Sequence, residues 1–247
     1  NGIGTSSGHV AHNFCEHVMG PSLTGLVKDR IGKPRTNDDG RPGGFYVPRF
    51  RNLSERHPNF IRAYGFEGGS GTTMFPGNAH DTPGFGAAYK KNVRDHAGAF
   101  ISMGGFGEVL PRYENQVALD PVMKDRWGIP VLRFNYRFGD NEKKMCQDMA
   151  ETAQEMFERA GFEIVSIDRT VLTEGWSIHE LGTARMGTDR KSSVLNQFQQ
   201  SHDVGNLFVV DGSSHVSASC QNRTWTIMAL AGRSCDYLVS EFRKGNL

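Results

Sequence analysis

Two short segments carry residue types that could move a proton or hold a polar ligand. The segment HELGTARMG places His179 beside a turn, and imidazole is the usual side chain for proton transfer near neutral pH. The run Asn222-Arg223-Thr224 begins an expected helix. Free amides and the positive dipole end at such a start suit a ring carbonyl or an anion.

A third candidate is the Asp211-Gly212 pair. It closes NLFVVDGS at 206–213, an almost wholly apolar run that predicts a strand buried on both faces. The carboxyl ends of such strands are where α/β folds hold ligands, and a small turn residue lets a cofactor approach the backbone.

Each of these features also has an ordinary structural interpretation. His179 could be a histidine with a purely structural role, Asn222 an N-cap, and Asp211-Gly212 a turn after a strand. No other chemistry is favoured. The sequence has no CxxC motif and shows no Ser-His-Asp context, and no carboxylate or cysteine set completes a metal site with His9, His12 and His17.

The elements that must position these residues change in type along the chain. From about 44 to 138 the pattern is mostly strands, with a loop-like stretch from Gly68 to Gly98. The expected strands lie in FYVPRFRNL, NFIRAYGFEG, GAFISMGGFGEVL, NQVALD and PVLRFNYRF. A helix capped by Asp140 and stopped by Gly161 carries an apolar stripe, which contains Met145, Met149, Ala153, Met156, Phe157 and Ala160. EIVSID predicts another strand, and 224–242 a final helix.

Bulk composition excludes several classes of protein. The 247 residues carry a formal net charge of +1, without the basic stripe that phosphate neutralisation requires, so no nucleic-acid partner is expected. No window approaches a membrane span. The first residue is Asn1 rather than Met, which predicts that further sequence lies upstream.

Glycine-rich motifs do not predict a nucleotide-binding loop. GIGTSSG superficially matches a dinucleotide fingerprint through Gly2, Gly4 and Gly8. A phosphate-binding loop must follow a strand and open a helix, and no strand precedes these glycines.

Taken together, the ordered motifs resemble the C-terminal half of the glucose-methanol-choline (GMC) oxidoreductases. The resemblance runs through NGIGTSSGHVAHNFCEH, NQVALDPVMKDRWGIPVLRFNY and the long terminal segment from HELGTARMG to GRSCDYL. It implies an FAD-dependent oxidoreductase that oxidises a CH-OH group by hydride transfer to flavin N5.

The resemblance also implies roles for individual residues. His179 falls on the family's catalytic histidine and Asn222 on its partner, which is His or Asn in different members. Asp211, Gly212 and Thr224, together with Asn222, fall on positions that line the flavin. Arg223 departs from the family pattern, which usually has Pro there.

The implied fold is α+β. It comprises an antiparallel-sheet substrate domain backed by helices, plus the C-terminal portion of an α/β flavin-binding domain. The expected boundaries are 1–20 for a flavin-domain segment, 21–170 for the substrate domain and 171–247 for the C-terminal flavin-domain and catalytic segment. The ADP-binding fingerprint is absent, so an upstream FAD-binding half is an expected partner, in the same gene or as a separate chain.

Within the family, GGFYVPRFRNL followed by NFIRAYGFEGG looks most like bacterial sugar and glucoside 3-dehydrogenases related to pyranose oxidase. This resemblance implies a sugar substrate, oxidised at C3 in many members. It also implies a periplasmic or secreted location and an electron-acceptor subunit as a further partner. Arg49 and Arg51 are two residues apart, so a strand would place both on one face, where they could bind sugar hydroxyls. A solvated strand face is the other interpretation.

Two rival functions stay open. A noncatalytic carbohydrate-binding or scaffold subunit of a flavoenzyme complex would bind sugar without yellow colour. A lyase or isomerase that reuses the scaffold would turn over without an electron acceptor.

Overall fold

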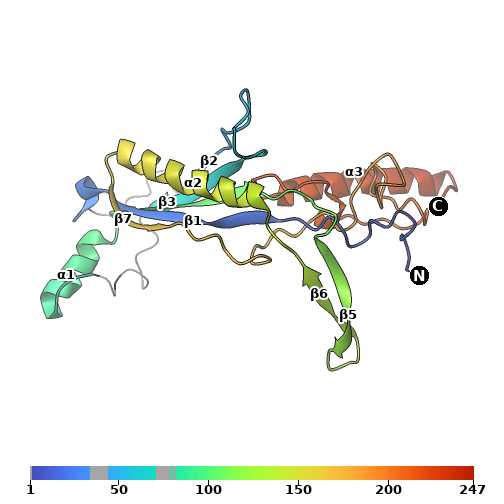
Figure 1. Ribbon diagram of the computed structural model, residues 1–247, viewed down its shortest axis with the longest axis horizontal. Coiled ribbons are helices and arrows are strands. Elements are labelled where there is room, and N and C mark those ends of the chain that lie inside the picture. The colour runs from blue at the N-terminus through green and yellow to red at the C-terminus, as the bar shows by residue number, and fades with distance from the viewer. Residues whose placement is uncertain (1, 34–43, 71–78, 80–81) are drawn as a thin grey trace. The chain divides into compact units, whose positions relative to one another are not determined.

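The computed structural model describes residues 2–33, 44–70, 79 and 82–247. They form two compact units, each assembled from separate stretches of chain (Figure 1). Unit 1 contains residues 1–18, 108–139 and 173–247, and unit 2 contains residues 19–107 and 140–172.

A five-stranded sheet forms the framework of unit 2. Its strand order is β2-β3-β4-β1-β7, and the pairs β2-β3, β3-β4 and β1-β7 are antiparallel. The strands are β1 His17–Leu26, β2 Gly44–Val47, β3 Tyr64–Ser70, β4 Phe100–Glu108 and β7 Glu163–Asp168. A short 3-10 turn, Lys28–Arg30, follows β1.

Helix α2, Asp140–Arg159, covers one face of this sheet (Figure 1). Met145, Met149, Ala153 and Phe157 recur at helical spacing, and all four side chains are buried. The helix was predicted from the same periodicity, and the structure confirms it and the burial of these four side chains. Of the other two residues in the predicted stripe, Met156 is half-buried, and Ala160 is exposed and follows the end of the helix.

Helix α1, Gly86–His96, corrects the expectation that 68–98 is loop-like. No residue of α1 is buried, so its sequence carries no apolar stripe that would reveal a helix. Part of the stretch, residues 71–78, 80 and 81, lies outside the described residues.

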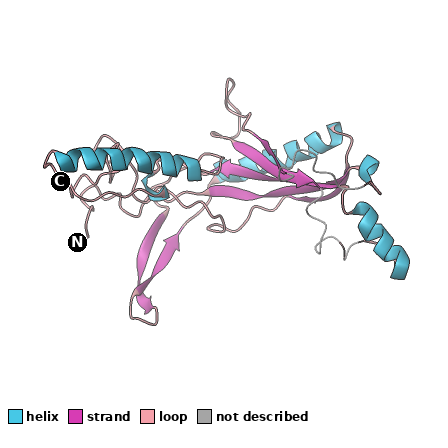
Figure 2. Ribbon diagram, turned by 180° about the vertical axis from the view of Figure 1, so that it is seen from behind, coloured by secondary structure: helices cyan, strands magenta, loops and turns pink. Residues whose placement is uncertain are grey.

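Unit 1 contains a two-stranded antiparallel hairpin, β5 Gln116–Lys124 with β6 Pro130–Asn135 (Figure 2). It also contains the short 3-10 turn Gly212–Ser214 and helix α3, Thr224–Arg243. A small apolar cluster of Cys15, Leu181 and Ala218 lies at its core.

The prediction of a doubly buried strand at 206–213 is wrong. The bridge that this segment makes is an isolated one between Phe208 and Gln200, and residues 212 and 213 belong to a 3-10 turn. Leu207 is 36% exposed and Val210 is 39% exposed. A strand is buried on both faces only within a sheet covered on both sides, and the described residues do not place this segment in one.

The architecture confirms the predicted fold class, because antiparallel sheets and helices are combined as expected. The predicted domain boundaries stay a prediction: unit 2 contains residues 19–107 and 140–172, whereas residues 108–139 belong to unit 1. Among the described residues, no helix has the length and apolar character that crossing a membrane requires.

Candidate active site

A reciprocal pair of backbone hydrogen bonds sets the position of His179. The amide of Cys15 donates to the carbonyl of Leu181 over 3.1 Å, and the amide of Leu181 donates to the carbonyl of Cys15 over 2.9 Å. In an antiparallel pair, residues two positions away on either side again lie opposite each other on the same face. Since His179 precedes Leu181 by two and His17 follows Cys15 by two, the bridge places the two histidines opposite each other.

The two imidazole rings are in contact. Their centroids are 4.8 Å apart and their planes cross at 86°, an edge-to-face arrangement. His17 is buried and His179 is half-buried. The Nη2 atom of Arg223 lies 3.4 Å from Nε2 of His17. Because a guanidinium has only donors, Nε2 of His17 accepts this hydrogen bond, and a neutral His17 carries its proton on Nδ1.

Arg223 stands between the two predicted ligand-facing residues at the start of α3. Its guanidinium is buried and donates to the carbonyls of Ala218 over 2.8 Å and Ser219 over 3.2 Å. Asn222 and Thr224, on either side, are exposed. Within the described chain no side chain caps this helix start, so its first amides remain free to meet a ligand. Arg223 therefore links the region of Asn222 to the two histidines.

The Asp211-Gly212 turn packs against the segment that carries His179. Oδ1 of Asp211 accepts hydrogen bonds from the amide of Ser213 over 2.9 Å and from its hydroxyl over 2.5 Å. A Cβ atom on Gly212 would lie 2.9 Å from Cδ2 of Leu181 and 3.0 Å from the carbonyl oxygen of Glu180. Close packing within the protein therefore explains this glycine without a cofactor. The exposed side chain of Asp211 is still available to a ligand.

The surroundings of the histidines contain a buried positive charge. Burial lowers the pKa of Arg223, but an arginine in a protein stays protonated. Its Nε and Nη1 atoms are buried without a hydrogen-bond partner among the described residues. Burial lowers the pKa of His215, and the charge of Arg223 lowers it further. Burial raises the pKa of the Cys15 thiol to about 12, so this thiol is neutral at neutral pH.

A buried carboxyl, Glu16, precedes His17. It is 1% exposed, and its Oε1 accepts a hydrogen bond of 3.0 Å from the amide of Gly175. Burial raises the pKa of Glu16 to about 7, although the hydrogen bond from Gly175 opposes the shift. Glu16 therefore changes its charge close to neutral pH.

We expect Glu16→Gln to weaken the pH dependence of stability. The folded-state pKa of about 7 lies above the ordinary value of 4.5, so between these values the folded protein binds more protons than the unfolded chain. The free energy of unfolding therefore falls as pH rises through this window. Urea unfolding at about pH 5 and about pH 8 should show a smaller difference for Glu16→Gln than for the parent. Glu114→Gln, at an exposed position, is the control. An equal difference in unfolding free energy between the two pH values for parent and Glu16→Gln would contradict the prediction.

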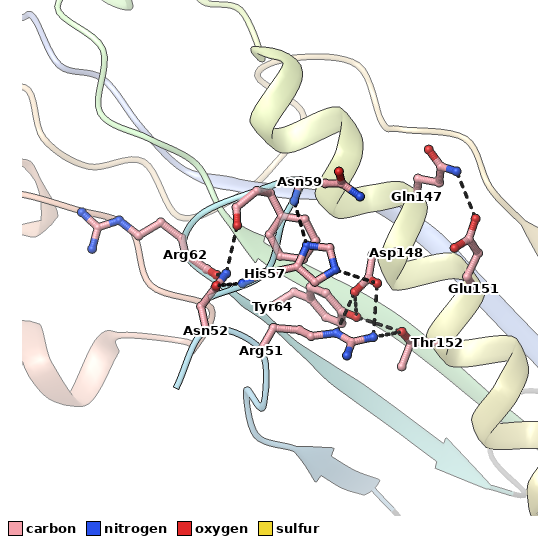
Figure 3. Close-up of polar contacts among 11 residues, drawn as sticks. Arg51, Asn52, His57, Asn59, Arg62, Tyr64, Gln147, Asp148, Glu151 and Thr152 are labelled. Atoms are coloured by element: carbon pink, nitrogen blue, oxygen red, sulfur yellow. Dashed lines mark hydrogen bonds and ion pairs between the residues drawn. The ribbon is translucent and has the colours of Figure 1, made fainter. Parts of the chain in front are cut away.

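Arg49 and Arg51 do not share a strand face. Strand β2 ends at Val47, before either residue, so the expected strand placement is wrong. Nε of Arg51 donates to Oδ2 of Asp148 over 2.9 Å, and its Nη2 donates to Oδ1 over 3.2 Å (Figure 3). These bonds tie the loop after β2 to α2. Arg49 is exposed.

The same carboxylate holds a buried tyrosine. The hydroxyl of Tyr64 donates to Oδ2 of Asp148 over 2.5 Å and lies 3.0 Å from Oγ1 of Thr152 (Figure 3). Tyr64 is fully buried, and burial raises its pKa. Arg51 supplies the positive charge that this partly buried carboxylate needs, so its observed contacts serve the packing of α2 on the sheet.

Sequence reasoning proposed a proton-transfer role for His179 but gave no such role to His17, although His17 closes the family-like segment NGIGTSSGHVAHNFCEH. The signal that could have found it is the spacing in CEH, because residues two apart on a strand share a face. The partner register, which decides what that face meets, is visible only in the structure.

Comparison with known proteins connects the chain to one enzyme family. Residues 111–231 match the family model described as GMC oxidoreductase. That range includes His179, the Asp211-Gly212 turn and Asn222, but not His17.

Three curated relatives are each 30% identical to the chain over the aligned residues. The 2-methyl-1,2-propanediol dehydrogenase of Mycolicibacterium austroafricanum aligns with 98% of the chain and 44% of its own length. The gluconate 2-dehydrogenase flavoprotein of Pantoea cypripedii aligns with 73% of the chain and 32% of its own length. The C-glycoside 3-oxidase of Arthrobacter globiformis aligns with 58% of the chain and 28% of its own length. The chain thus spans less than half the length of these relatives.

A solved structure shares the fold. The crystal structure of pyridoxine 4-oxidase from Mesorbium loti superposes with a TM-score of 0.55 at 17% identity, covering 93% of the chain and 43% of the solved one. The low identity limits this likeness to the fold.

Proposed function

The chain belongs to the GMC oxidoreductase family, and we propose that it carries the proton-transfer residues of an FAD-dependent enzyme that oxidises a CH-OH group of a sugar or glucoside. The family is an oxidoreductase family, and one relative is named as a flavoprotein. The observation that carries the proposal is the contact between the rings of His179 and His17. A hydrogen bond from Arg223 connects His17 to the start of α3.

The residues near α3 suit a flavin. The uncapped helix start offers free amides and the positive end of the helix dipole, which match ring carbonyls. Asn222, Thr224 and Asp211 present exposed polar side chains, and we propose that they line the flavin together with Gly212. Bound flavin supplies the hydride acceptor.

In this proposal His179 accepts the hydroxyl proton while the carbinol hydrogen leaves as hydride. Its ring is half-buried and held by contact with His17, so its orientation is set before substrate arrives. Asn222 holds the hydroxyl oxygen by donating a hydrogen bond. The buried surroundings of His17 and Arg223 exclude water from the far side of the pair.

We propose a pyranoside as substrate because GGFYVPRFRNL resembles sugar dehydrogenases and one relative is named a C-glycoside 3-oxidase. Oxidation would then take place at C3. Exposed Arg49 is the proposed contact to the sugar hydroxyls, whereas Arg51 belongs to the α2 network. A small aliphatic diol is the second candidate, because the relative that aligns with 98% of the chain is named a diol dehydrogenase.

A substrate screen tests the proposal. The flavin-loaded enzyme that contains this chain is mixed with pyranosides, 2-methyl-1,2-propanediol or gluconate, and flavin reduction and turnover with an artificial electron acceptor are followed. We expect kcat/KM for the preferred pyranoside to exceed that for the diol by about tenfold or more. Faster turnover of the diol would reject the sugar substrate and keep the chemistry. Sugar binding without bound flavin would instead identify a carbohydrate-binding subunit.

A further inference from the structure

We propose that Arg223 is a positioning residue that keeps the His17–His179 pair neutral, through its buried charge and its hydrogen bond to Nε2 of His17. The proposal deepens the proposed function, and it rests on that function only where it assigns proton acceptance to His179.

The geometry supports this role in two steps. Arg223 places Nη2 at 3.4 Å from Nε2 of His17, and both side chains are buried. A proton on Nε2 would point at a guanidinium that can only donate. Protonation of His17 would therefore break this hydrogen bond and place two positive charges together in a buried site.

The second step is the effect of the charge on His17 on the protonation of His179. Because the rings touch at 4.8 Å between centroids, a charged His17 would be a second cation beside His179. A like charge within about 4–6 Å disfavours the protonated form of a base, so the state of His17 controls how readily His179 takes a proton. A neutral His17 leaves His179 able to accept the substrate proton.

Other ionisable groups also face Arg223. Cys15 and Glu108 have the largest electrostatic effects on the pKa of Arg223, and Cys220 has a smaller one. The charge of Arg223 in turn lowers the pKa of His215. Glu16, next to His17, changes charge near pH 7. Several ionisable groups therefore surround Arg223, and only substitutions of Arg223 itself isolate the effect of its charge.

A purely structural role for Arg223 makes a different prediction. Its hydrogen bonds to the carbonyls of Ala218, Ser219 and Gln221 could simply hold the loop before α3. In that case every substitution would lower stability, and none would shift the pH profile of the folded fraction.

The test compares Arg223→Met, Arg223→Gln and Arg223→Lys in the flavin-loaded enzyme that contains this chain. For Met and Gln we expect the acid limb of the kcat/KM profile to move to higher pH by about one unit. For Lys, which keeps the charge, we expect the limb to stay within a few tenths of a unit of the parent. An unshifted limb in both neutral variants, or an equal shift in all three, would overturn the proposal.

A second readout does not depend on activity. Histidines labelled with 13C at Cε1 are titrated by NMR in parent, Met and Lys enzymes, and the His17 signal is assigned with His17→Gln. We expect His17 to titrate at higher pH in Arg223→Met than in parent or Lys. An unchanged His17 titration overturns the proposal even if alcohol oxidation is confirmed. A shifted titration in an enzyme that does not need His179 would support the charge effect and reject the proposed function.

Discussion

Replacing His179 by Ala should slow the reduction of flavin by substrate by about 10²- to 10⁴-fold, the usual contribution of a positioned base. The enzyme should still fold and hold flavin, because His179 is half-buried and its segment is held by the backbone bridge between Cys15 and Leu181. Stopped-flow absorbance at about 450 nm, the flavin band, measures the rate, and a melting curve measures stability.

Further variants separate a catalytic His179 from a structural one. Asn222→Ala should cost less, because Asn222 orients the hydroxyl without taking its proton. The two losses should not add in the double variant, since both side chains act on one hydroxyl. His96→Ala, on helix α1 without buried residues, is the matched control. Lost stability with a near-parent rate in the folded fraction of His179→Ala would reject proton transfer by this residue.

The second large effect is expected for Gly182→Ala, three residues after His179. Gly182 has φ +89°, and a Cβ atom there would lie 2.3 Å from the carbonyl oxygen of Asn13 and 3.4 Å from Sγ of Cys15. Backbone atoms cannot move aside as a flexible side chain can. We expect a loss of about 3 kcal/mol or more in the free energy of unfolding.

The same substitution should impair the site. Relief of the clash requires the Asn13–Cys15 segment to separate from the segment of Leu181, which moves His17 away from His179. Flavin reduction should therefore slow even in the fraction that remains folded. Gly205→Ala is the control, because a Cβ atom on Gly205 would meet nothing within 4 Å, and this variant should change stability by less than about 0.5 kcal/mol. Equal melting temperatures for the two variants would contradict the packing argument.

Local periodicity was enough to predict the long helices and most strands. Helix α2 begins at Asp140, the residue that was predicted to cap it, and its buried stripe is encoded locally. Strand β1 was missed, since Gly20, Pro21 and Gly25 interrupt its pattern and weaken the propensity for a strand. Its place in the sheet comes from pairing with β7, far along the chain.

The prediction of a buried strand at 206–213 was wrong because its local pattern was misleading. Its composition favours a buried strand, but burial depends on neighbours that a single segment does not reveal. The site shows the same division. His179 and Asn222 were predicted as site residues from their motifs, whereas the contact of His17 with Arg223 joins residues 206 positions apart. Register and long-range contact decide which polar side chains meet.

The division of the chain into units has a consequence for biosynthesis. The chain passes from one unit to the other at 18/19, 107/108, 139/140 and 172/173. Unit 2 has all of its residues once Leu172 is made, whereas His17 must wait for Arg223. At about 5–20 residues per second, those 206 residues take about 10–40 s to synthesise. During that time His17 lacks its contact with Arg223, although the partners of Glu16 and Cys15, Gly175 and Leu181, are made earlier. A chain released between Leu172 and Arg223 therefore contains every residue of unit 2 but lacks Arg223, the partner of His17.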